Sequence, residues 1–183
     1  MKKKTYKFTD FHEFIIIIRI LNIINSFKNT IIIIFKMDLI NKLIEISNDI
    51  YSSIGPGYNE VIYHKAFEVA LRLNGINYQS EVITPLFYKG YNIGHGRVDI
   101  IVGNLIIIEL KALSNFNSDT ANIQIKNYMN NYSITQGLII NFGQSSKCDH
   151  NTVNIKYIHF TNGLFKIFKY NNGAFEDTEM NIT

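Results

Sequence analysis

Hydrophobic residues from about Asp38 onward follow a helical period. Four of them recur at steps of four, three and four residues: Leu39, Leu43, Ile46 and Ile50. Residues at this spacing share one face of a helix, so the pattern predicts a helix with one buried face. Gly55-Pro56-Gly57 ends it, because proline lacks a backbone donor and glycine adopts dihedral angles that other residues avoid.

A second helix is predicted from about Tyr58 to Asn74. Its apolar stripe is formed by Ile62, Ala66, Val69 and Leu73. Gly75 is a suitable stop, because glycine readily takes the left-handed conformation that often follows a helix C-terminus.

Beyond Gly75 the pattern becomes that of strands. Residues 77–88 are typical of extended chain, and residues 89–92 are typical of a turn. Two aliphatic runs follow at 98–102 and 105–110, and Gly103-Asn104 between them is a short hairpin signal.

The later part of the domain predicts one more helix and two more strands. The helix begins at Ser118 or Asp119, and its stripe consists of Ala121, Ile125, Tyr128 and Tyr132. Buried strands are predicted at 137–142 and 153–160. All-aliphatic strands joined through helices predict an α/β fold with a central mixed β-sheet flanked by helices.

The composition limits the class of protein and its compartment. With 183 residues and 46% hydrophobic residues, the chain is large enough for one folded domain. Cys148 is the only cysteine, so no intrachain disulfide and no multi-cysteine zinc site can form. A reducing, intracellular location is therefore expected, either cytoplasmic or with the nucleoid or nucleus.

Charge is distributed unevenly along the chain. Residues 1–36 carry seven basic and two acidic residues, a net charge of +5, whereas residues 37–183 carry eleven and thirteen, a net charge of −2. Residues 171–183 form a polar, acidic tail. Because the body is not basic, any nucleic-acid role must depend on a local site, such as one where a metal neutralises carboxylates.

Residues 1–36 differ from the rest by their isoleucine blocks at 15–18 and 31–34. A basic start before an apolar run is typical of a signal peptide or membrane anchor. Charged residues interrupt both the approach and the span, and neither block nears the roughly 18–20 apolar residues that a spanning helix needs. The favoured interpretation is a poorly constrained extension, with the working domain at 37–170. A membrane role and an extra packed helix are the alternatives.

Three charged residues interrupt the aliphatic strands. Glu109 and Lys111 are two positions apart in one run and so share a face, and Asp99 lies in the partner run. Burying any of them unpaired would be costly, and hard divalent cations prefer carboxylate oxygens, so a small metal site is one interpretation. A solvated Asp99–Lys111 ion pair at a strand end is the other.

Two further residues are weaker candidates. Glu60 falls in the first turn of the second helix, where an acid can simply offset the helix dipole. Gln124 lies one turn before Tyr128 on the later helix, and a glutamine there is unremarkable alone. The histidines have no mutual metal spacing and are read as ordinary surface or hydrogen-bonded residues.

Several of these segments together resemble a known family. Gly57-Tyr58-Asn59-Glu60-Val61-Ile62-Tyr63 is similar to the motif that names the GxxExxY proteins, a branch of the PD-(D/E)XK nuclease superfamily. The resemblance continues in order through Arg97-Val98-Asp99, Ile108-Glu109-Leu110-Lys111-Ala112, Gln124 with Asn127-Tyr128, and Leu138-Ile139-Ile140-Asn141-Phe142-Gly143. It covers roughly residues 38–160. The leading proline of the superfamily motif is replaced by Val98.

The resemblance implies a restriction-endonuclease-like core that cleaves phosphodiester bonds with Mg²⁺, or Mn²⁺ in its place. By it, Asp99 and Glu109 would be metal ligands, Glu60 would assist metal binding, Lys111 would be the catalytic lysine and Gln124 would support the site. The expected substrate is nucleic acid, DNA rather than RNA, with specificity supplied by a homodimer or a partner protein. The alternative is a non-catalytic nucleic-acid-binding or assembly module with the same fold.

A shared metal site also makes a demand on strand register. A two-residue turn at Gly103-Asn104 would place Asp99 and Glu109 on opposite faces of the sheet, because side chains alternate along a strand. One metal could not then bind both. We therefore predict a loop with an odd number of residues or a bulge, with Gly103 supplying a positive φ.

Overall fold

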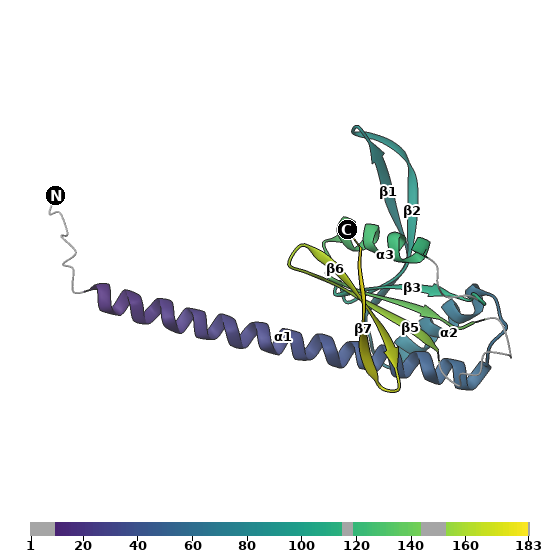
Figure 1. Ribbon diagram of the computed structural model, residues 1–183, viewed down its shortest axis with the longest axis horizontal. Coiled ribbons are helices and arrows are strands. Elements are labelled where there is room, and N and C mark those ends of the chain that lie inside the picture. The colour runs from purple at the N-terminus through teal and green to yellow at the C-terminus, as the bar shows by residue number, and fades with distance from the viewer. Residues whose placement is uncertain (1–9, 115–118, 144–152, 183) are drawn as a thin grey trace. The chain divides into compact units, whose positions relative to one another are not determined.

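A computed structural model describes residues 10–114, 119–143 and 153–182 of the protein (Figure 1). The helices are α1 (Asp10–Ile54), α2 (Glu60–Leu73) and α3 (Asp119–Tyr132). The strands are β1 (Tyr78–Tyr88), β2 (Tyr91–Val102), β3 (Ile106–Lys111), β4 (Gln136–Asn141), β5 (Asn154–Thr161), β6 (Leu164–Asn171) and β7 (Ala174–Ile182). The proposed cap Ser118 and the single Cys148 lie outside the described residues.

Helix α1 is much longer than predicted. It begins at Asp10 instead of near Asp38, so residues 10–36 are helical. The sequence contains no glycine or proline between Asp10 and Ile54, and the change in charge and composition near residue 36 does not oppose helix formation. The chain divides into two compact units, Met1–Lys42 and Leu43–Thr183, and α1 contributes residues to both. A working domain that starts at Met37 remains a prediction.

In the first unit, α1 exposes large apolar side chains between residues 20 and 35, among them Ile20, Phe27 and Ile31. In the part of the chain that the structure describes, no helix combines the length and the apolar character needed to cross a membrane.

The second unit contains the sheet and the C-terminal part of α1. Leu43, Ile46 and Ile50 are buried, as their spacing predicts. Helix α1 ends at Ile54, and Gly55 follows with a φ of 72°. Helix α2 is likewise followed by Gly75 with a φ of 65°, which confirms both predicted stops.

The predicted apolar stripe of α2 is wrong. Its buried residues are Tyr63, His64, Phe67 and Leu71. Three residues of the predicted stripe, Ile62, Val69 and Leu73, are exposed instead. Helix α2 offers two apolar stripes, and the one with the large aromatic rings is buried because burial of these rings removes the most apolar surface from water.

The seven strands form one sheet in chain order, β1 to β7. Strands β3 and β4 are parallel, and every other neighbouring pair is antiparallel. Helix α3 makes the crossover that a parallel pair requires. The mixed sheet confirms the α/β prediction. Strands β6 and β7 were not predicted. Strand β7, residues 174–182, is an edge strand within the segment that the sequence analysis describes as an acidic tail.

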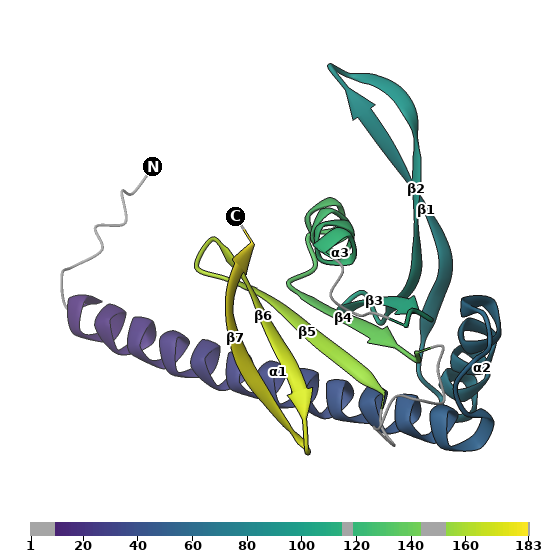
Figure 2. The same ribbon diagram turned by 45° about the vertical axis from the view of Figure 1, so that its right-hand side comes forward.

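Helices cover both faces of the sheet near β3 and β4 (Figure 2). Ile125 and Met129 of α3 pack with Ile107 and Ile139 in one apolar core. Alternate strand residues face the other way, and there Phe142, directly after β4, stacks on Tyr63 of α2 with ring centroids 4.3 Å apart. The β3–β4 pair is therefore the centre of the packed body.

Gly137 of β4 lets α3 approach closely, which gives a test of this packing. A Cβ atom there would lie 2.8 Å from Ile125 Cδ1 and 2.9 Å from Met129 Sδ. We expect Gly137→Ala to lower the free energy of unfolding by about 1–3 kcal/mol through overpacking, as measured by urea denaturation. Ile123→Ala, on the exposed side of α3, is the control and should change it by less than about 0.5 kcal/mol. Equal effects would contradict the packing argument.

The predicted domain boundary can be tested by truncation. A chain that begins at Met37 should retain all seven strands and lose the helical signal of residues 10–36 in circular dichroism, because these residues are helical in the full chain. Aggregation of the shortened chain, reversed when residues 1–36 are restored, would show that the domain needs them.

Candidate active site

The β2–β3 hairpin has the register that a shared site requires. Ile100 pairs with Ile108, and Val102 pairs with Ile106, so three residues form the loop. Gly103 has a φ of 54°, as predicted. Continuing this register by one residue places Asp99 opposite Glu109. The prediction of an odd loop is confirmed.

Asp99 lies where β2 stops pairing with β3. The β2–β3 ladder ends at the Ile100–Ile108 pair, and beyond it the backbone N–H of Leu110 donates to Asp99 Oδ2 at 2.8 Å. The carboxylate thus takes the place of a backbone acceptor. On the other side, Glu81 of β1 lies opposite Asp99 in register and has a φ of 53°, in the region that L-residues rarely adopt. The backbone is irregular on both sides of this acid.

Glu109 is the most buried acid of the group, with 1% of its surface exposed. Its Oε1 accepts a hydrogen bond from Lys111 Nζ at 2.6 Å. Its Oε2 is buried and has no hydrogen-bond partner in the described structure. Burial, with the charge of Asp99 as the next cause, raises the pKa of Glu109 to about 7 against the effect of Lys111.

The neighbouring groups are perturbed in the same way. Burial raises the pKa of Asp99, although the Leu110 N–H bond and the charge of Lys111 act against it. Burial disfavours the charged form of Lys111, but the surrounding carboxylates, Glu109 first, outweigh it, so the pKa of Lys111 is raised. Lys111 is therefore a cation at neutral pH.

Glu60 reaches the same group from the first turn of α2. Its Oε2 lies 3.8 Å from Lys111 Nζ. Burial raises the pKa of Glu60, Lys111 lowers it, and Asp99 raises it further. The helix cap is provided by Asn59, whose Oδ1 accepts from the Ile62 N–H. Glu60 is thus not needed as a cap and is available to the site.

Tyr63 fixes the segment that brings Glu60 into place. Its hydroxyl donates to the Gly55 carbonyl at 2.8 Å and accepts from the Tyr58 N–H at 3.3 Å. Its ring is fully buried against Phe142. The tyrosine therefore holds the turn between α1 and α2, which determines where the first turn of α2 begins.

His64 is a hydrogen-bonded core histidine, as expected from its spacing. Its Nε2 lies 3.2 Å from the Asp99 carbonyl oxygen and 3.4 Å from Ser80 Oγ. Since a carbonyl only accepts, Nε2 carries the proton. His64 thereby supports the backbone of Asp99.

Gln124 is placed differently from the acids. Its Nε2 donates to the Tyr128 hydroxyl at 3.3 Å. That hydroxyl donates to the Arg97 carbonyl at 2.9 Å and accepts from the Arg97 N–H at 3.2 Å. Gln124 therefore acts on β2 through Tyr128. Its predicted role as a supporting residue stays a prediction.

Arg97 and His64 are the residues near the acids to which the sequence assigned no role. Arg97 forms an ion pair with Glu81 at 3.2 Å. Its charge acts against the burial that raises the pKa of both Asp99 and Glu60. The signals for Arg97 were its place in the Arg97-Val98-Asp99 motif and its position two residues before Asp99, which puts both side chains on one face of an extended strand.

The donor set fits a divalent cation through two strand carboxylates. The unpartnered Oε2 of Glu109 leaves a buried acceptor free, and carboxylate oxygens are the ligands that Mg²⁺ prefers. Among the described residues, no three His, Cys, Asp or Glu side chains are gathered so as to hold a metal. Lys111 lies within contact distance of both Glu60 and Glu109, so the predicted metal-ligand role of Glu60 stays a prediction.

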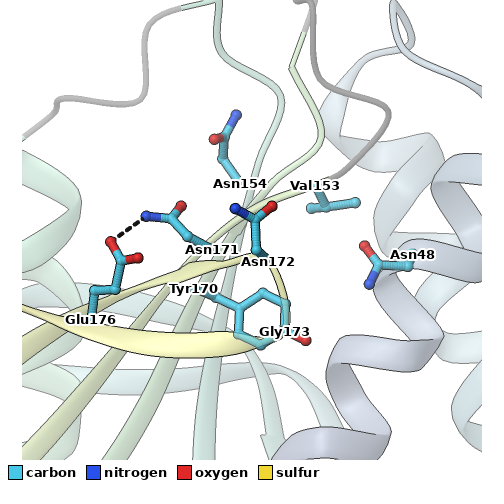
Figure 3. Close-up of a pocket in the computed structure, with 8 residues that line it drawn as sticks. All are labelled: Asn48, Val153, Asn154, Tyr170, Asn171, Asn172, Gly173 and Glu176. Carbon is cyan, nitrogen blue, oxygen red and sulfur yellow. Dashed lines mark hydrogen bonds between the residues drawn. The ribbon is translucent and has the colours of Figure 1, made fainter.

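A polar cavity of about 420 Å³ lies elsewhere in the second unit (Figure 3). Four of its eight lining residues are asparagines, and Asn171 Nδ2 donates to Glu176 Oε2 at 2.7 Å. No candidate site residue lines this cavity. The acidic group at β2 and β3 is therefore the candidate active site.

Comparison with known proteins gives one match. A family model described as the PD-(D/E)XK nuclease superfamily matches residues 37–153, well over half of the 183-residue chain. The matched segment contains all five candidate residues: Glu60, Asp99, Glu109, Lys111 and Gln124. No curated protein and no solved structure matches the chain.

The raised pKa of Glu109 predicts an unusual pH dependence of stability without metal. An acid with a higher pKa in the folded state keeps its proton there while the unfolded chain loses it, so stability falls as the pH rises from about 4.5 to 7. The loss is on the order of 3 kcal/mol at about 1.4 kcal/mol per pKa unit. Urea denaturation in EDTA should show this fall, and Glu109→Gln should remove most of it.

The control for this experiment is Glu176→Gln, which changes an exposed carboxylate bonded to Asn171. Its pH profile should match that of the unmodified protein. A fall that persists in Glu109→Gln would assign the pH dependence to other groups.

Proposed function

The chain belongs to the PD-(D/E)XK nuclease superfamily, and we propose that it is a metal-dependent nuclease that hydrolyses phosphodiester bonds in nucleic acid. Its seven-stranded mixed sheet with flanking helices is a restriction-endonuclease-like fold. We further propose that it is a GxxExxY member and that DNA is the substrate. The observation that carries the proposal is the buried Glu109 carboxylate, which lies beside Lys111 and has one oxygen unpartnered.

In this proposal Asp99 and Glu109 hold a divalent cation, Mg²⁺ or Mn²⁺. Such a cation lowers the pKa of a water molecule and offsets charge that develops on the phosphate. The Leu110 N–H fixes one oxygen of Asp99. Lys111 fixes one oxygen of Glu109. Each carboxylate is thus oriented by the protein before any cation binds, which lowers the reorganisation needed at the site.

Lys111 supplies a fixed positive charge. Since its pKa is raised by the surrounding carboxylates, it acts as a cation that attracts the phosphate, and it does not act as a proton acceptor while Glu109 and Glu60 are charged. Glu60 limits the movement of the ammonium from the other side at 3.8 Å. Gln124 and Tyr128 are positioning residues that hold β2 at Arg97.

The rival function is a binding or assembly module that no longer turns over substrate. The net charge of −2 on residues 37–183 favours it, because a duplex bound over a broad surface attracts a basic protein. The presence of both strand acids and the lysine in one partly buried group favours the nuclease. Specificity from a homodimer or a partner protein remains part of the proposal.

Removing either strand acid should abolish cleavage. Asp99→Asn or Glu109→Gln removes a cation ligand, and a loss of several kcal/mol in transition-state stabilisation is on the order of a 1,000-fold lower kcat. Lys111→Gln should act in the same direction. The measurement is Mg²⁺- or Mn²⁺-dependent cleavage of single-stranded, duplex and branched DNA and of RNA by the purified full-length chain.

Glu176→Gln serves as the control carboxylate and should cleave at the unmodified rate. Full activity of Asp99→Asn would defeat the assignment. Binding of these substrates without cleavage by the unmodified protein, over a range of both metals, would favour the non-catalytic module.

A further inference from the structure

Strands β1 and β2 continue beyond the body as a two-stranded arm, residues 83–97. In Figure 2 their far ends extend past the other strands of the sheet. The pairing runs from Ile83–Arg97 to Tyr88–Tyr91, with a bulge at Leu86/Phe87. Because β3 pairs with β2 only at residues 100–102, the arm has no third strand among the described residues. Isolated two-stranded ribbons are marginal in water, so an arm of this length needs a reason.

The base of the arm is held by two tyrosines of α3. The Tyr132 hydroxyl lies 2.9 Å from Thr84 Oγ1 on β1. The Tyr128 hydroxyl binds both the N–H and the carbonyl of Arg97 on β2, and its ring lies against Gly96, where a Cβ atom would be 3.0 Å from Cε1. Each strand is therefore fixed to the body at its root, and the arm leaves the body in a defined direction.

The end of the arm exposes aromatic rings beside a cation. Phe87, Tyr88 and Tyr91 are 63%, 62% and 77% exposed. Tyr88 and Tyr91 are direct cross-strand partners and so share a face. Lys89 Nζ lies 5.4 Å from the centre of the Tyr88 ring. Exposed rings next to a positive charge are the combination on which unpaired bases stack.

Charge distinguishes the arm from the rest of the body. Residues 82–98 contain Lys89, Arg97 and His95 and no acid, whereas residues 37–183 together carry a net charge of −2. The nearest acids in sequence on either side are Glu81, which is paired with Arg97, and Asp99. The arm is thus suited to a polyanion.

Strand β2 joins the arm to the candidate active site directly. Arg97 is two residues from Asp99, and Tyr91 is eight residues away, about 26 Å at ~3.3 Å per residue. A polynucleotide with one phosphate at Asp99 and Glu109 could therefore follow β2 to the exposed rings. From these observations, and resting on the proposed nuclease function, we infer that the arm binds a single-stranded segment of nucleic acid next to the bond that is cleaved.

The experiment uses the full-length chain and two readouts. Binding of a fluorescein-labelled 15-residue oligothymidylate is measured by anisotropy in EDTA, and hydrolysis of bis(4-nitrophenyl) phosphate is measured with Mn²⁺. The variant is Tyr88→Thr with Tyr91→Thr, which removes both rings and keeps β propensity. We expect a 10- to 100-fold weaker Kd, on the scale of base–aromatic stacking, and unchanged hydrolysis of the small diester, which is too short to reach the arm.

The control is Phe27→Ala with Phe35→Ala, which removes two exposed rings from α1 and should leave both readouts unchanged. A second variant, Lys89→Ala, should reduce the dependence of log K on log salt by about 0.7, as expected for one phosphate contact to a single strand. Lys89→Ala tests the inference by itself if the double tyrosine variant fails to fold.

The outcomes separate the two proposals. Oligothymidylate affinity that is unchanged in both arm variants overturns the inference. A lower oligomeric mass of the tyrosine variant in analytical ultracentrifugation, with unchanged affinity, also overturns it and would make the arm a contact between copies of the chain. Absence of oligothymidylate binding by the unmodified chain also overturns it. Arm-dependent binding in a protein that hydrolyses neither the small diester nor any polynucleotide would support the arm and contradict the nuclease.

Discussion

The candidate site depends on the burial of one carboxylate at a break in the sheet. Glu109 lies in a strand whose residues 106–108 and Leu110 are aliphatic and buried, and it is itself almost completely buried. Such burial is tolerable only with partners, and Lys111 satisfies one of its two oxygens. The second oxygen is buried without a hydrogen-bond partner, next to the point where β2 stops pairing with β3. The divergence of β2 and the burial of Glu109 are therefore parts of one arrangement.

Tyrosine hydroxyls hold the irregular segments around this arrangement. Tyr63 binds the backbone at both sides of the turn before α2, and Tyr128 binds both backbone groups of Arg97. In each case an aromatic ring is anchored in a core, and its polar end satisfies backbone groups that no strand or helix partner reaches. The two tyrosines thus restrain the irregular backbone, which is what precise placement of Glu60 and Asp99 requires.

Much of this arrangement could be predicted from the sequence, because it depends on local pattern. The charged residues in the aliphatic strands identified Asp99, Glu109 and Lys111, and the parity of side chains fixed the loop length. The buried face of α2 could not be predicted, since both of its stripes are apolar and only the tertiary partner Phe142 selects Tyr63. The start of α1 was wrong for a related reason: composition changes near residue 36, but helix propensity does not. Strand β7 was missed because a polar edge strand carries little periodic signal, whereas β6 does carry an apolar alternation that the sequence analysis did not use.

The charges of the candidate site favour the divalent cation of the proposed function. Asp99, Glu109, Glu60 and Lys111 carry a formal charge of −2 when all are ionised. Without a cation this fully ionised state is unfavourable. The pKa of Glu109 is therefore raised to about 7, and Glu109 is partly protonated near neutral pH. A divalent cation would neutralise the group, favour the ionised form of Glu109 and release that proton. Cation binding should then strengthen as the pH rises through 7, which links the buried carboxylate, the lysine beside it and the ion in one equilibrium.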